Sequence, residues 1–155
     1  STGQHLVFNP RWPQGRATSL AEGAQALLRP GRALPECILI QNVDQPTRAS
    51  IIDRLVAAQR ELDADVVQPG YDDVDGDEHG GHPVVVAGRL LPELAAVREE
   101  TFGLRAVVTL HPPVRVPFDR DPAVWLDLDT PDLLPEARRV FGVFDERDGA
   151  TEGAC

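Results

Sequence analysis

A short apolar run that ends on a carboxylate constrains the fold of this chain most strongly: Ile38-Leu-Ile-Gln-Asn-Val-Asp44-Gln-Pro46. Apolar side chains follow at helical spacing over residues 47–62, and residues 65–69 have the composition of a second short strand. A strand, a helix and a strand in this order predict a right-handed crossover and a parallel pair of strands. Ligands of open α/β sheets bind at the C-terminal ends of strands, so Asp44 is the first candidate site residue.

The remaining pattern extends this unit to a single α/β domain over residues 1–142, with helices flanking a mostly parallel sheet. Thr18 or Ser19 is expected to cap a helix that runs to Leu28. Further strands are predicted at 6–8, 84–86 and, as an edge strand, 114–118, and a further helix at 90–97. The pattern of residues 101–110 fits a helix or a strand, and a helix is favoured because no clean alternation occurs. Residues 143–155 lack periodicity and are predicted to form a disordered tail.

A second group of carboxylates lies in the stretch Ala123-Val-Trp-Leu-Asp127-Leu-Asp129. The stretch alternates, so a strand there puts Asp127 and Asp129 on one face, before a helix that Thr130 caps. Carboxylates at two strand ends can converge on one Mg²⁺ ion, which favours phosphoryl or nucleotidyl transfer. The alternative is structural: Asp44 only starts a turn and Asp129 only supports the helix cap.

The loop over residues 71–83 is acidic and rich in glycine, which raises the question of a calcium site. An EF-hand is excluded, because Val84 stands where the bidentate glutamate of such a loop belongs. His79 and His82 are of a type that binds metals, but the sequence offers no clear third ligand. A solvated loop with a buried or hydrogen-bonded His82 is therefore the favoured interpretation.

Composition excludes several function classes. The net charge of -10 makes nucleic acid and anionic membranes poor partners, and all 15 basic residues are arginine. Cys37 and Cys155 have no spacing typical of a disulfide framework or a thiolate metal site, and no apolar stretch has transmembrane length. We therefore expect a cytoplasmic protein. Motifs of serine hydrolases, Walker-type NTPases, dinucleotide dehydrogenases and zinc proteases do not occur.

Several short motifs occur in the order and spacing of one known family. They are Asn9-Pro-Arg-Trp12, Gly15-Arg-Ala-Thr18-Ser19-Leu20, Val43-Asp44-Gln45-Pro46, Gly80-Gly81-His82-Pro83-Val84, Gly103-Leu-Arg105-Ala106 and Asp127-Leu-Asp129-Thr130-Pro131-Asp132-Leu133. In this respect the chain resembles the MobA-like nucleotidyltransferases over about residues 7–142, and among them most closely the molybdenum cofactor cytidylyltransferases. The resemblance rests on the shared order of these motifs.

The resemblance implies a Rossmann-like, glycosyltransferase-A-like fold. It also implies transfer of a nucleoside monophosphate from CTP or GTP to a phosphorylated acceptor, typically a pterin phosphate such as molybdopterin, with release of pyrophosphate. By the same resemblance Asp44 and one of Asp127 and Asp129 bind Mg²⁺. The cap-support role of Asp129 makes Asp127 the favoured ligand. Thr18 and Ser19 would lie near the nucleotide base, and Gly81, His82, Pro83 and Arg105 would face the acceptor.

The chain departs from this family in one respect. Relatives begin with a strand and a glycine-rich loop, and a later lysine helps to hold the triphosphate; here nothing before Leu6 resembles that loop, and lysine is absent. Two interpretations follow: the chain is the C-terminal portion of a longer enzyme, or it is a shortened, non-catalytic relative that acts as a binding or partner subunit. A missing first strand would leave a sheet edge exposed, which predicts a partner chain or self-association.

Overall fold

The sheet of the computed structural model is mixed and has five strands. The structure describes residues 5–31, 33–73, 75–118 and 121–142, so the predicted tail over 143–155 lies outside the described residues. The strands are β1 (Cys37–Ile40), β2 (Val66–Asp72), β3 (Glu78–Gly80), β4 (Val84–Ala87) and β5 (Val114–Pro117). The helices are α1 (Arg16–Leu27), α2 (Ala49–Leu62), α3 (Leu91–Ala96), α4 (Leu104–Leu110) and α5 (Leu134–Phe141).

β4 lies between β1 and β2 and is antiparallel to both, whereas β5 is parallel to β2. β1 and β2 therefore run in the same direction, but they are not neighbours. The prediction of a hydrogen-bonded parallel pair is wrong in this respect, and the sheet is mixed rather than mostly parallel. The reason is the run Val84-Val-Val-Ala87, which is buried on both faces and so belongs in the middle of the sheet.

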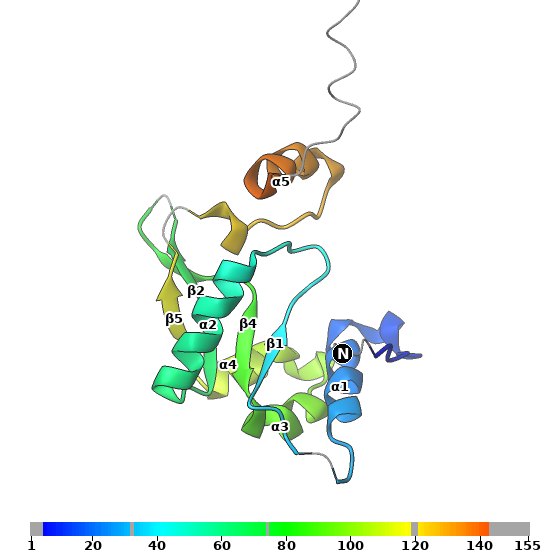
Figure 1. The fold of residues 1–155 in the computed structure, drawn as a ribbon. Helices are drawn as coiled ribbons and strands as arrows, with labels where there is room; N and C mark the ends of the chain where they lie inside the picture. Colours follow the sequence, from blue (N-terminus) through cyan, green and yellow to red (C-terminus); the bar gives the residue numbers. More distant parts are fainter. Residues whose placement is uncertain (1–4, 32, 74, 119–120, 143–155) are drawn as a thin grey trace, which may run out of the picture.

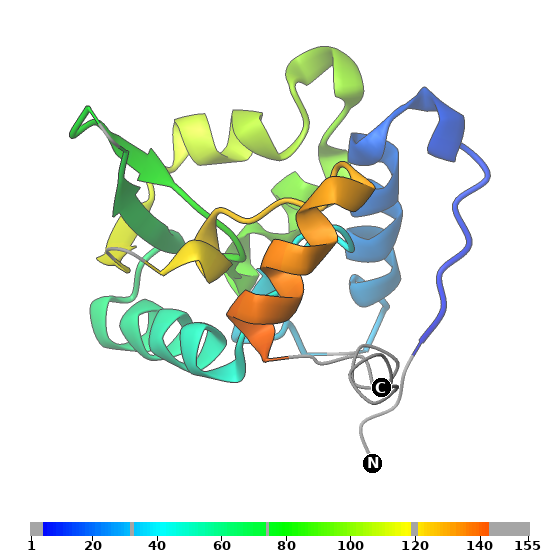
Figure 2. The same ribbon diagram turned by 90° about the horizontal axis from the view of Figure 1, so that it is seen from above.

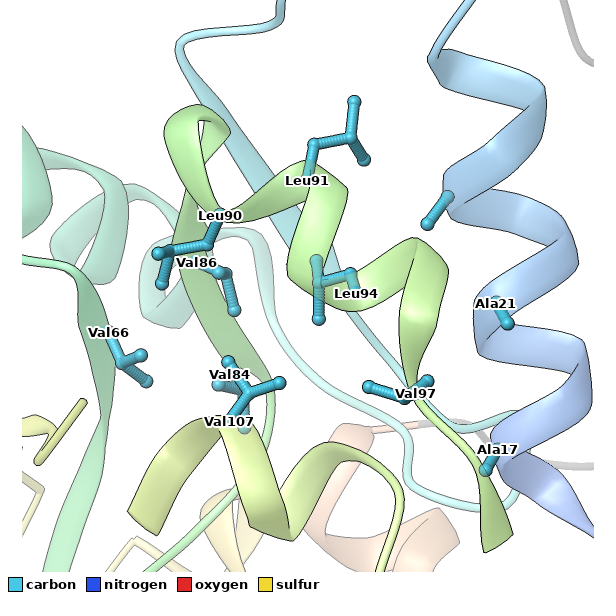
Figure 3. Close-up of a cluster of buried hydrophobic side chains, with 11 residues drawn as sticks. Ala17, Ala21, Val66, Val84, Val86, Leu90, Leu91, Leu94, Val97 and Val107 are labelled. Atoms are coloured by element: carbon cyan, nitrogen blue, oxygen red, sulfur yellow. The ribbon is translucent and has the colours of Figure 1, made fainter. Parts of the chain in front are cut away.

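Side chains of the central strands alternate between two apolar clusters. Val84 and Val86 pack with α1, α3 and α4, as Figure 3 shows, whereas Val85 packs with α2 on the opposite face. Leu55 of α2 is fully buried in this second cluster. Helices thus flank the sheet on both faces (Figure 1), and the predicted Rossmann-like α/β domain is confirmed. None of the helices in the described part of the chain has the length and apolar character to cross a membrane.

α1 begins at Arg16, three positions before the later of the two predicted capping residues. Its cap comes from far away in the sequence: the Glu99 Oε2 atom accepts a hydrogen bond from the Ala17 N–H at 2.9 Å. The hydroxyl of Thr18 instead donates to main-chain oxygens, that of Gly15 at 2.8 Å among them. The prediction that Thr18 or Ser19 is the N-cap is therefore wrong, because a carboxylate 82 positions away takes that role.

Two predicted strands are absent from the described residues. Residues 6–8 have no strand pairing, and Leu6 and Phe8 are exposed. Residues 123–129 begin with a 3₁₀ turn (Pro122–Val124), and the Leu126 N–H donates to the Pro122 carbonyl rather than to a neighbouring strand. The alternation of apolar and polar residues in this stretch arises because Val124 and Leu126 are buried, although the segment is irregular and is not a strand.

His111 joins the end of α4 to two carboxylates. Its Nδ1 lies 2.9 Å from Asp65 and its Nε2 lies 3.0 Å from Glu93. These hydrogen bonds raise the pKa of His111, the bond to Asp65 contributing most, because an imidazolium donates from both nitrogens and neutral imidazole from only one.

This network predicts a pH-dependent contribution to stability. A raised folded-state pKa means that the contribution is complete below the unfolded value, about pH 6.5, and is lost as the pH rises through the folded pKa. Urea unfolding should therefore show a larger loss of stability for His111→Asn at about pH 5.5 than at about pH 8.5. An equal loss at both pH values would contradict this role.

Candidate metal centre

Three carboxylates from two distant segments meet at one end of the sheet. One oxygen each of Asp44, Asp127 and Asp129 lies within 4.8 Å of the others, and this is the cluster of possible metal ligands found among the described residues. Asp44 and Asp127 are half-buried and Asp129 is exposed. Figure 1 shows the segment that carries residues 127 and 129 lying over the end of the sheet, where the loop after β1 emerges.

Hydrogen bonds between the two segments hold the cluster together. The Leu128 N–H donates to the Asp44 carbonyl at 2.8 Å. The Gln45 side-chain amide donates to Asp127 Oδ2 at 3.0 Å and accepts from the Asn42 side chain at 2.8 Å. The positions of Asp44 and Asp127 are thus fixed relative to each other, although 127 does not lie on a strand.

Arg48, the N-cap residue of α2, holds the C-terminal segment that carries Asp127 and Asp129. Its guanidinium donates to both carboxylate oxygens of Asp121, at 2.8 and 2.9 Å, and to the Val140 carbonyl at 2.6 Å. Both bonds to Asp121 come from Nη1, while Nη2 donates to the Val140 carbonyl, so the guanidinium bridges these two residues. The residues before and after the acidic cluster are therefore tied to the same helix.

Two oxygen atoms in the cluster lack a partner. Asp44 Oδ1 and Asp127 Oδ1 are buried, and neither accepts a hydrogen bond from any residue that the structure describes. A buried carboxylate oxygen without a donor costs free energy, which a bound cation or an ordered water molecule can offset. Hard divalent cations such as Mg²⁺ prefer carboxylate oxygen ligands, so the donor set and the unsatisfied atoms fit such an ion.

Asp127 also lines a cleft of about 910 Å³ that lies between α1, the end of β1, and α4. Three arginines, Arg16, Arg105 and Arg115, line the same cleft. Arg115 pairs with Glu78, whereas Arg16 and Arg105 form no ion pair within the described ranges. In a chain of net charge -10, this concentration of arginine makes the cleft suited to an anionic ligand.

His82 faces the same cleft and lies near the acidic cluster. Burial lowers its pKa, and the positive charge of Arg16 adds to that effect, whereas Asp127 and Asp44 oppose it. The imidazole is therefore neutral near pH 7. By contrast, His79 lies 2.7 Å from Asp73, stacks on Tyr71 and is outside the lining of the cleft.

Gly81 and Pro83 do not line the cleft, although the family resemblance places both at the acceptor site. Both are buried. The Gly81 N–H donates to the Pro69 carbonyl at 2.8 Å, and the His82 N–H donates to the Val124 carbonyl at 2.9 Å. Of the three residues predicted in this motif, His82 is the one whose side chain borders the cleft.

Gly81 has no room for a side chain, which gives a testable prediction. A Cβ atom at Gly81 would lie 2.3 Å from the Val124 carbonyl oxygen, so Gly81→Ala should reduce the free energy of unfolding by about 1–3 kcal/mol. Gly23 on α1 is the matched control: nothing lies within 4 Å of its Cβ position, and Gly23→Ala should stabilise the helix by about 0.5–1 kcal/mol. Urea unfolding of both variants checks this, and equal effects would refute it.

Thr18 and Ser19 lie on the first turn of α1 but outside the lining of the cleft. Thr18 is buried and accepts a hydrogen bond from the Asn9 side chain at 2.8 Å, while the exposed Ser19 accepts from the same amide at 2.9 Å. Ser19 lines a separate, apolar cavity of about 560 Å³ against β1. Their structural role is thus to tie the Asn9 loop to α1.

Sequence reasoning missed three residues of this site. Gln45 holds Asp127, Arg16 lines the cleft, and Glu99 caps the helix that carries Arg16. Gln45 and Arg16 both lie in motifs that contain predicted site residues. Arg16 could have been found if the helix had been predicted to begin after Gly15. Glu99 has no local signal, because its partner is distant in the sequence.

Comparison with models of known protein families identifies the family of the chain. A model of the family described as MobA-like NTP transferase domain matches residues 1–116. No curated protein matches the chain. The matched range includes Asp44, His82 and Arg105 and ends before Asp127. The place of Asp127 and Asp129 in the acidic cluster is thus supported by the geometry of the structure and not by the family match.

Proposed function

Because the chain belongs to the MobA-like NTP transferase domain family, we propose that it transfers a nucleoside monophosphate from CTP or GTP to a phosphorylated acceptor such as molybdopterin. The family supports nucleotidyl transfer in general. The observation that carries the proposal is the pair of buried, unpartnered oxygens of Asp44 and Asp127 beside a cleft lined by arginine. Carboxylates and arginines in this arrangement suit a substrate that carries both phosphates and a divalent cation.

Each residue of the site then has a role. Asp44 and Asp127 would hold Mg²⁺, with the exposed Asp129 as a further ligand within reach of both. When bound, the ion neutralises phosphate charge and holds the phosphates in line. Arg16 and Arg105 have no carboxylate partner in the described part of the chain, and they bind phosphate oxygens of the substrates. The neutral imidazole of His82 forms a hydrogen bond with the molecule that receives the nucleoside monophosphate.

The proposed reaction balances without a proton donor. A phosphate oxygen of the acceptor attacks the α-phosphorus of the nucleotide, and a new phosphoanhydride bond forms. The bond between the α- and β-phosphates breaks, and pyrophosphate leaves with its electron pair. The main task of the chain is then to position two polyanions and to offset their repulsion.

Calorimetric titration of the full chain with CTP and GTP, with and without Mg²⁺, tests the proposal. We expect binding of at least one nucleotide that disappears when EDTA removes the metal. Addition of a phosphorylated pterin should then release pyrophosphate. Metal-independent binding, or no binding of either nucleotide, would contradict the proposal.

A second candidate is a non-catalytic subunit that keeps the fold. Two observations favour it: the chain contains no lysine for the triphosphate, and within the described residues β1 pairs with β4 alone, so its other edge is open to a partner chain or a second copy. This function predicts nucleotide binding without pyrophosphate release, together with a complex in sedimentation measurements. Turnover by the isolated monomer would exclude it.

A further inference from the structure

Phe102 is an exposed aromatic residue at the border of the cleft. It is 77% exposed and lines the cleft together with Arg105 and His82. Its φ angle is 65°, in the left-handed region that bulky residues rarely adopt. Neither feature stabilises the fold, because the ring buries little surface and the left-handed backbone costs about 1–2 kcal/mol.

The turn that carries Phe102 is held firmly against α1. The Phe102 N–H donates to the Glu99 carbonyl at 3.0 Å, and the Gly103 N–H donates to the Arg98 carbonyl at 2.9 Å. A Cβ atom at Gly103 would lie 3.1 Å from the Ala17 Cβ, so the turn packs closely on the helix. Figure 2 shows this turn, between α3 and α4, beside the start of α1. The ring therefore sits on a fixed backbone.

The surroundings of Phe102 indicate what the ring contacts. Arg16 and Arg105 supply positive charge in the same cleft, and Asp127 brings the acidic cluster to its wall. A ligand that contacts all of these groups would carry phosphates, which suit the arginines, and a planar ring, which suits Phe102. Stacking of a heteroaromatic ring on an exposed aromatic side chain contributes about 1–3 kcal/mol and tolerates different rings.

We propose that Phe102 is a substrate-binding residue on which the heteroaromatic ring of the substrate stacks, while the arginines of the cleft bind its phosphates. The inference rests on the proposed function, since both substrates of that reaction, the nucleotide and the pterin, carry such a ring. A backbone strained to present an exposed ring is expected at a ligand site rather than in a structural turn.

Binding of four probes to the Mg²⁺-loaded full chain tests this role: CTP, GTP, the pterin neopterin, and inorganic tripolyphosphate, which has no ring. Phe102→Ala should weaken the ring-bearing ligand by about 5- to 100-fold and leave tripolyphosphate unchanged. Phe102→Trp should restore binding. Leu110→Ala is the matched control, because Leu110 is a large apolar side chain with a similar exposure, 73%, and lies on α4 outside the lining of the cleft.

Comparison of the four probes shows whether the stacked ring belongs to the nucleotide or to the pterin. A loss confined to CTP or GTP assigns the stack to the nucleobase, and a loss confined to neopterin assigns it to the acceptor. If the wild-type chain binds a ring-bearing probe and Phe102→Ala binds it equally well, the stacking role is refuted and the proposed function stands. If the wild-type chain binds no ring-bearing probe, both are refuted.

Discussion

Asp44→Asn should weaken Mg²⁺-dependent nucleotide binding by about 100-fold or more, and nucleotidyl transfer by at least as much. The substitution keeps the size of the side chain and removes one negative charge from the acidic cluster. At an effective dielectric constant near 20, a unit charge about 4 Å away contributes about 4 kcal/mol, and about 1.4 kcal/mol corresponds to a factor of ten in affinity. Titration of nucleotide at fixed Mg²⁺ measures the change.

Asp53→Asn is the control for this variant. Asp53 lies exposed on α2, so the substitution makes the same change in net charge away from the cluster. It should leave nucleotide affinity unchanged within about twofold, because exposed charges are screened by solvent. Equal losses for the two variants would show that net charge, rather than a metal at Asp44, controls binding.

Leu55→Ala should reduce the free energy of unfolding by about 2–5 kcal/mol. Leu55 is fully buried on α2, in the cluster that joins this helix to Val67, Val85 and the 121–141 segment. Truncation removes apolar contacts and leaves a cavity that the neighbouring strands are too rigid to fill. Such a loss is a large part of the stability of a typical domain, so the thermal midpoint should fall by many degrees.

Leu62→Ala is the matched control on the same helix. Leu62 is the last residue of α2 and is 57% exposed, so its truncation should change stability by no more than about 0.5 kcal/mol. Urea unfolding of both variants, followed by circular dichroism, provides the comparison. Similar values for the two leucines would mean that α2 does not pack on the sheet as described.

The elements that depend on local pattern were predictable from the sequence. α2 was expected over residues 47–62 and occupies Ala49–Leu62, because its apolar stripe and the proline before it are local signals. The strand at 84–86 was likewise found. The position of that strand between β1 and β2 was not predicted, because pairing depends on which strand can be buried on both faces, and the unbroken valine run alone carried that information.

The acidic residues of the site were predictable from the sequence, whereas the hydrogen bonds that position them were not. Asp44 and Asp127 were chosen from strand-end positions, yet residue 127 lies on an irregular segment, and the cluster forms through the Gln45–Asp127 and Leu128–Asp44 hydrogen bonds. Such contacts join residues more than 80 positions apart and have no periodic signature. For the same reason the cap of α1 by Glu99 and the placement of Phe102 became visible only in the structure.

Anomalous diffraction from a crystal of the full chain soaked in Mn²⁺, as a substitute for Mg²⁺, tests the central claim most directly. We expect one strong peak with carboxylate oxygens of both Asp44 and Asp127 as ligands, at about 2.0–2.2 Å, the range of oxygen ligands around a small divalent cation. A peak at another place, or the side chains of Asp44 and Asp127 turned away from each other with no metal between them, would contradict it.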